Sequence, residues 1–83
     1  MTDLPHWHRV DNDKAIQRDY HFSNFHETMA FVNAVAFIAH ETNHHPDLEI
    51  GYNYCRIKFT THDAGGVTDK DLASAKKVNG LLP

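Results

Sequence analysis

The order of hydrophobic and polar residues along the chain predicts two pairs of strands, each followed by a helix. Residues 6–10 and 15–22 flank an Asp-Asn-Asp cluster at 11–13, which is typical of a turn. Alternate positions from Ile16 to Phe22 include three aliphatic or aromatic side chains, and the positions between them are polar. This period of two favours a half-buried strand, so we expect a first hairpin here.

A long amphipathic helix is predicted over residues 24 to about 42, which contain neither Gly nor Pro. Ser23 offers an N-cap, and the helix must end near Asn43 because Pro46 disfavours helical geometry at the preceding residue. The apolar side chains recur at helical spacing: Phe25, Met29, Val32, Ala36 and Ala39, with Phe31, Val35 and Ile38 widening the stripe. This stripe can simply pack on the sheet, or one flank of it can also pack against another subunit.

A second pair of strands is expected at residues 48–52 and 54–61, followed by a turn at 63–66. In the later strand two sets of side chains alternate, namely Tyr54, Arg56, Lys58 and Thr60 against Cys55, Ile57, Phe59 and Thr61. One set is polar and the other mostly apolar, which indicates a strand with one buried face.

A final helix is expected over residues 69–79, between a Thr68 cap and a Gly80 stop. The elements then follow the order strand, strand, helix, strand, strand, helix. This order predicts an α+β domain, a four-stranded antiparallel sheet with the helices packed on one face.

Size and composition narrow the class of protein. A chain of 83 residues is a single domain, 1–83, and its one cysteine, Cys55, excludes an internal disulfide. A domain this small gains stability from a metal, from self-association or from a well-packed core.

The formal net charge of −3 argues against nucleic acid as a direct partner. The longest apolar run, 34–39, is too short for a membrane span, and the free thiol fits a reducing compartment, so we expect a cytoplasmic protein.

Histidine is the most informative residue type, with eight copies in the chain. Two clusters lie where predicted elements end, at residues 43–47 and 60–63. If the second strand pair runs back beside the end of the first helix, His44, His45 and His62 share one pocket. Three imidazoles can donate and accept protons near neutral pH without a metal.

Simpler readings of these histidines stay open. His44 or His45 alone can be a favourable cation at a helix C-terminus, and His62 alone can be a surface residue. His40 and His44 lie one helical turn apart and with His62 could bind zinc, although the chain lacks an H-E-x-x-H helix and a cysteine pair. The other four are expected to be solvated: His6, His8, His21 and His26.

Several of these residues together resemble one known family. They are His44-His45-Pro46-Asp47, Tyr52, Thr60-Thr61-His62-Asp63, Gly65-Gly66 and Asp71. In order and spacing they resemble the pterin-4a-carbinolamine dehydratase family, most specifically over residues 40–71. The family fold, a four-stranded antiparallel sheet with helices on one face, is the one expected above.

The resemblance implies a hydro-lyase that dehydrates 4a-hydroxytetrahydropterin to quinonoid dihydropterin and so recycles a pterin cofactor. It implies a catalytic trio of His44, His45 and His62, with His44 and His62 as acid and base and His45 mainly holding the pterin ring. The implied substrate-binding residues are Pro46, Asp47, Thr60 and Thr61. No metal and no further cofactor is implied, because the pterin is the substrate.

Two departures from the family pattern bear on these expectations. His40 stands where the family usually carries a carboxylate, and the chain starts at a segment that family members usually precede with another helix. The domain is therefore expected to lack that first helix. Members commonly form dimers or tetramers, so a homodimer or homotetramer is expected. The alternative function is a non-enzymatic dimerisation or assembly factor on the same scaffold.

Overall fold

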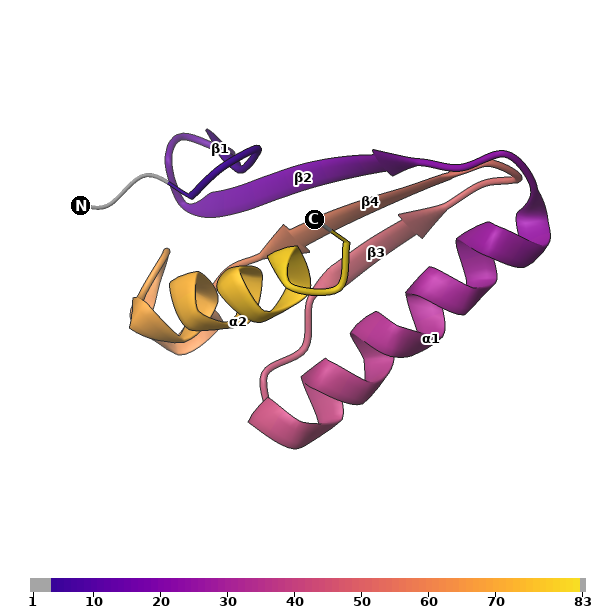
Figure 1. Cartoon of the computed structure of the whole chain (residues 1–83). Coiled ribbons are helices and arrows are strands. Elements are labelled where there is room, and N and C mark those ends of the chain that lie inside the picture. The colour runs from indigo at the N-terminus through magenta and orange to yellow at the C-terminus, as the bar shows by residue number, and fades with distance from the viewer. Residues whose placement is uncertain (1–3, 83) are drawn as a thin grey trace.

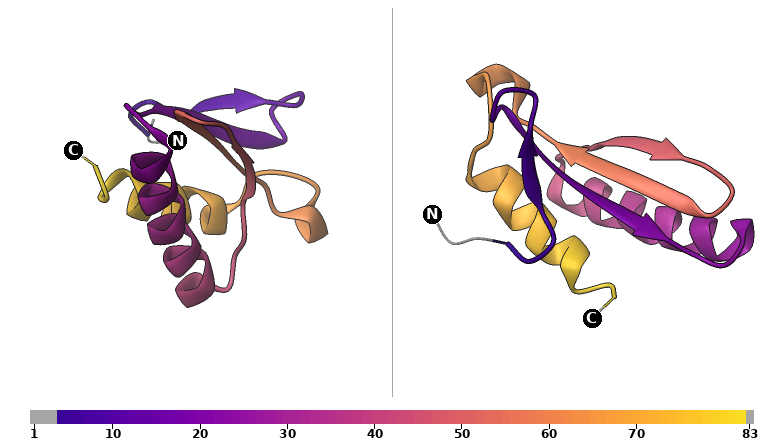
Figure 2. Two further views of the ribbon diagram at one scale, coloured as in Figure 1. Left: turned by 90° about the vertical axis from the view of Figure 1, so that its right-hand side faces the viewer. Right: turned by 90° about the horizontal axis from the view of Figure 1, so that it is seen from above.

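The sheet and its two helices form two layers (Figure 1). The computed structural model describes residues 4–82. Its elements are β1 (His8–Val10), β2 (Ala15–His21), α1 (Phe25–Thr42), β3 (Asp47–Ile50), β4 (Tyr54–Phe59), a 3₁₀ helix (His62–Ala64) and α2 (Asp69–Asn79). The strands pair antiparallel in the order β1-β2-β4-β3. Both helices lie on the same side of the sheet (Figure 2). The predicted α+β fold and element order are confirmed.

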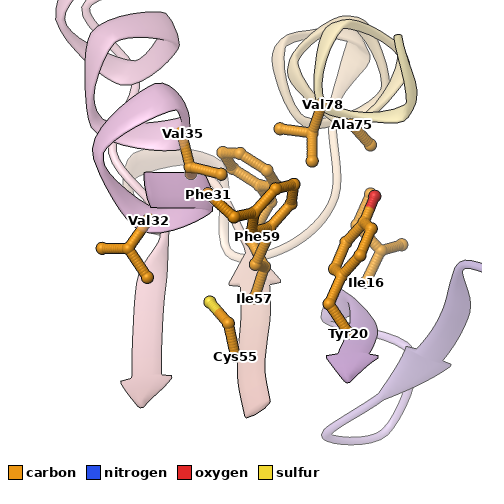
Figure 3. Close-up of a cluster of buried hydrophobic side chains, with 10 residues drawn as sticks. All are labelled: Ile16, Tyr20, Phe31, Val32, Val35, Cys55, Ile57, Phe59, Ala75 and Val78. Atoms are coloured by element: carbon orange, nitrogen blue, oxygen red, sulfur yellow. The ribbon is translucent and has the colours of Figure 1, made fainter. Parts of the chain in front are cut away.

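The inner strand β4 shows why one face of the sheet is buried. Cys55, Ile57 and Phe59 are fully buried, whereas the residues between them are partly exposed. Their side chains meet those of α1 and α2 in a single core (Figure 3). Its buried members are Ile16, Tyr20, Phe31, Val32, Val35, Cys55, Ile57, Phe59, Ala75 and Val78. The alternation predicted for β4 is therefore the alternation that makes the core.

The start of α1 differs from the prediction by one residue. Asn24, not Ser23, is the N-cap, and its side-chain oxygen accepts a 2.8 Å hydrogen bond from the backbone N–H of Glu27. Ser23 lies one position earlier, and its backbone N–H donates to the Glu27 carboxylate at 3.0 Å. Both residue types cap helices well, so the sequence could not separate them. The helix ends at Asn43 as expected, where φ is 51°.

The connections around the second strand pair also differ from the prediction. β3 begins at Asp47 rather than residue 48, and β4 ends at Phe59 rather than residue 61. Where a turn was expected at 63–66, the chain forms the 3₁₀ helix, which ends at Ala64 and is capped by Gly65, where φ is 73°. Because β4 ends two residues early, Thr60 and Thr61 lie in the connection toward α2 rather than in the strand.

Packing on the sheet buries only part of the apolar stripe of α1. Phe31, Val32 and Val35 are buried, but Phe37 is 63% exposed and Phe25 is 49% exposed. The expected contact with another subunit stays a prediction. Within residues 4–82, no helix is both long enough and apolar enough to cross a membrane.

The buried thiol of Cys55 is expected to make the free energy of unfolding depend on pH. Burial raises the pKa of its thiol to about 11, from an ordinary value of 9.0. The folded protein therefore keeps a proton that the unfolded thiol loses. Its contribution to the free energy of unfolding is fully present below pH 9 and falls by about 2–3 kcal/mol as the pH rises to 11.

Denaturant unfolding from pH 8 to 11, compared with Cys55→Ala, measures this contribution, because the variant lacks the thiol. Parallel pH profiles for the two proteins would contradict the expectation. Native protein should also resist alkylation at pH 8, since Cys55 has no exposed surface.

Candidate active site

A pocket of about 340 Å³ lies where the chain leaves α1, leaves β4 and enters α2. Its lining residues are Asn43, His44, His45, Thr60, Thr61, His62, Asp63 and Lys70. The three histidines proposed from the sequence thus lie around one pocket, together with Thr60 and Thr61. Pro46 and Asp47 do not line it. Asp47 lies beside Leu48 and Arg56 in a separate hollow of about 280 Å³.

His44 is the most firmly held of the three imidazoles. Its Nε2 lies 2.6 Å from Oδ1 of Asp71, and the two side chains are 14% and 0% exposed. Its ring stacks on Phe59, with centroids 5.9 Å apart and planes 13° from parallel. Its backbone N–H donates to the carbonyl of Ala39 at the end of α1. Backbone, ring face and ring nitrogen are therefore all fixed.

The partner carboxylate, Asp71, belongs to the capping box of α2. Its Oδ2 accepts the backbone N–H of Thr68 at 2.8 Å and the hydroxyl of Thr61 at 2.7 Å. An ionised carboxylate can only accept, and every group around it can donate. If Asp71 is ionised, Nε2 of His44 carries the proton, and Nδ1 is left as the nitrogen that accepts from a ligand.

His45 and His62 are held much more loosely. Both are exposed, and neither side chain forms a hydrogen bond or ion pair with any part of residues 4–82. His45 follows the left-handed Asn43 and His44 in the loop after α1, and His62 begins the 3₁₀ helix. These two imidazoles are free to contact a ligand in the pocket.

The sequence analysis included Asp71 among the residues of the family resemblance but assigned it no role. The spacing Thr68-x-x-Asp71 is a capping-box pattern that marks the carboxylate as oriented toward the helix start. Only the fold brings His44, 27 positions away in the chain, to its other oxygen.

Lys70 was missed as well, and no sequence signal marked it. His40 does not line the pocket. Among the described residues, no three His, Cys, Asp or Glu side chains are grouped as metal ligands.

The sequence matches a known protein family over nearly its whole length. The family model of pterin 4 alpha carbinolamine dehydratase matches residues 1–81. The chain belongs to the pterin-4a-carbinolamine dehydratase family. The resemblance inferred from the motifs between His44 and Asp71 is therefore confirmed.

Similar proteins carry the family name provisionally. A pterin-4-alpha-carbinolamine dehydratase, so named without proof of activity, from Legionella pneumophila (strain Corby) is 53% identical over 76 residues, covering 92% of this chain and 67% of the relative. A protein of the same provisional name from Nitrosomonas eutropha is 49% identical over 76 residues, covering 92% of this chain and 66% of the relative.

Two solved structures share the fold. A crystal structure of a transcriptional coactivator/pterin dehydratase from Brucella melitensis superposes with a TM-score of 0.89 at 32% identity, covering 96% of this chain and 85% of that one. A pterin dehydratase-like RuBisCO assembly factor of the alpha-carboxysome superposes with a TM-score of 0.77 at 24% identity, covering 90% and 87%. The second likeness shows the fold alone.

Proposed function

We propose that the protein dehydrates a 4a-hydroxytetrahydropterin to the quinonoid dihydropterin by acid–base catalysis. The observation that carries the proposal is the pocket itself, with one imidazole locked against a buried carboxylate and two imidazoles unengaged. A base must be held still in one tautomer, whereas groups that meet the substrate must be free to contact it. Family membership supplies the substrate class.

The reaction requires that one proton is donated to the substrate and that one is removed from it. The hydroxyl on C4a leaves as water once it receives a proton, and the neighbouring ring nitrogen loses a proton as the new double bond forms. With Nε2 directed at Asp71, Nδ1 of His44 accepts the ring proton. Protonated His62 gives its proton to the leaving hydroxyl, and His45 holds the ring. Exchange of both protons with water restores the starting state.

Three of the four predicted substrate-binding residues have a part in this proposal, and Asp47 does not. Thr60 forms a wall, because its hydroxyl donates to the carbonyl of Lys14 at 2.6 Å and ties the loop to the start of β2. Pro46 limits the backbone of the histidine loop. Thr61 lies in the wall but directs its hydroxyl to Asp71. Asp47 lies outside the pocket and has no step in the mechanism.

A direct assay tests the proposed function. The protein is mixed with freshly generated 4a-hydroxytetrahydropterin, and the loss of the intermediate is followed by absorbance with and without a chelator. We expect a rate well above the spontaneous dehydration, unchanged by the chelator. No acceleration would reject the enzymatic function in favour of a dimerisation or assembly factor. Loss of activity in the chelator would support the zinc alternative.

We also propose that the protein is a cytoplasmic homodimer or homotetramer. The free buried thiol of Cys55 fits a reducing compartment, and exposed Phe25 and Phe37 fit a subunit contact. Sedimentation of the purified protein measures the oligomeric state.

A further inference from the structure

Two threonine hydroxyls lie between the start of α2 and the Asp71–His44 pair. Oγ1 of Thr61 lies 2.7 Å from Oδ2 of Asp71 and 2.8 Å from Oγ1 of Thr68. Oγ1 of Thr68 in turn accepts the backbone N–H of Lys70 at 3.3 Å. The helix cap, both hydroxyls, the carboxylate and the imidazole thus form one continuous chain of hydrogen bonds.

The direction of each bond in this chain follows from the donors available. The backbone N–H of Thr68 can only donate, so Oδ2 of Asp71 is an acceptor. The hydroxyl of Thr61 therefore gives its single proton to Oδ2, and it can only accept from Thr68. The hydroxyl of Thr68 donates its proton to Oγ1 of Thr61 and accepts the backbone N–H of Lys70. Each hydroxyl proton has one position.

This arrangement also favours one conformation of Asp71. The carboxylate is fully buried, and two donors on Oδ2 leave Oδ1 directed at His44. Without Thr61, Oδ2 would keep only the backbone donor of Thr68, and the carboxylate could rotate. The nitrogen of His44 that it engages would then be less strictly determined.

We propose that Thr61 and Thr68 are positioning residues that act through Asp71 to hold His44 in the Nε2–H form, with Nδ1 as the accepting nitrogen. Neither threonine needs to touch the substrate for this role. The catalytic consequence rests on the proposed dehydratase function, whereas the form of the His44 ring is a property of the protein alone.

Ring-nitrogen NMR of His44, assigned by comparison with His44→Gln, tests the proposal without an activity assay. We expect the wild-type ring in the Nε2–H form, and a measurable fraction in the Nδ1–H form in Thr61→Val and Thr68→Val. Thr61→Ser and Thr68→Ser keep the hydroxyl and should restore the wild-type spectrum. Thr42→Val is the matched control, because its hydroxyl bonds only carbonyls of its own helix.

Kinetics give the second readout. Thr61→Val should lower kcat by roughly tenfold, the effect of one lost hydrogen bond to a charged group, with KM nearly unchanged. Thr68→Val should lower kcat by less, because the Thr68 hydroxyl reaches Asp71 only through Thr61. An Nδ1–H ring in the wild type would overturn the proposal, and so would an unchanged ring in both folded valine variants. If only one of the two valine variants folds, the His44 ring in that variant decides. A wild-type protein without dehydratase activity would reject the proposed function but leave the ring measurement valid.

Discussion

Replacing His44 and His62 together by Ala is expected to remove the acceleration of pterin dehydration. The double variant loses both the proton acceptor and the proton donor of the proposed mechanism, each worth roughly 10²–10⁴-fold in rate. Both residues line the pocket, and His62 is exposed, so the fold should tolerate the loss of its ring. Stopped-flow absorbance on freshly generated substrate measures the rate, which should approach that of the spontaneous reaction.

The matched control for this experiment is His21→Ala with His26→Ala. Both histidines are exposed and lie outside the pocket, so that double variant should keep the wild-type rate. Full activity in the His44 and His62 variant, with circular dichroism showing a folded protein, would reject the histidine mechanism. Equal loss in both double variants would point to a general effect of removing histidine.

Asp71→Asn is expected to lower kcat by about 100-fold while the protein stays folded. The amide oxygen can still accept from Thr61 and from the backbone of Thr68, which leaves the amide nitrogen facing His44. An amide N–H donates, so Nε2 of His44 must become an acceptor and Nδ1 must carry the proton. Nδ1, the nitrogen that is available to the substrate, then already carries a proton and cannot accept another.

Steady-state kinetics and thermal unfolding test this prediction together. Asp69→Asn is the matched control, because Asp69 is an exposed residue in the same first turn of α2 and does not line the pocket. It removes the same charge at nearly the same place in the helix. If both variants lower kcat equally, the effect belongs to the helix dipole and not to the His44–Asp71 contact.

The regular elements were predictable because each carries its own periodic signal. β4 alternates partly exposed and buried residues from Tyr54 to Phe59, and α1 runs without Gly or Pro until Asn43. The exact first and last residues of these elements were harder to predict. Ser23 and Asn24 are both good caps, and the sequence could not tell that β4 would stop before Thr60, because strand ends depend on pairing with other strands.

The sequence by itself determined the fold class and the family, and it predicted the three histidines, because periodicity and the order of motifs can be read along the chain. It could not determine which histidine has a partner. Only the tertiary structure brings the loop after α1 to the start of α2, so that Asp71 meets His44 while His45 and His62 stay exposed. The physical reason is that a capping carboxylate has two oxygens. The local helix start occupies Oδ2, and what Oδ1 meets is decided by the packing of distant segments.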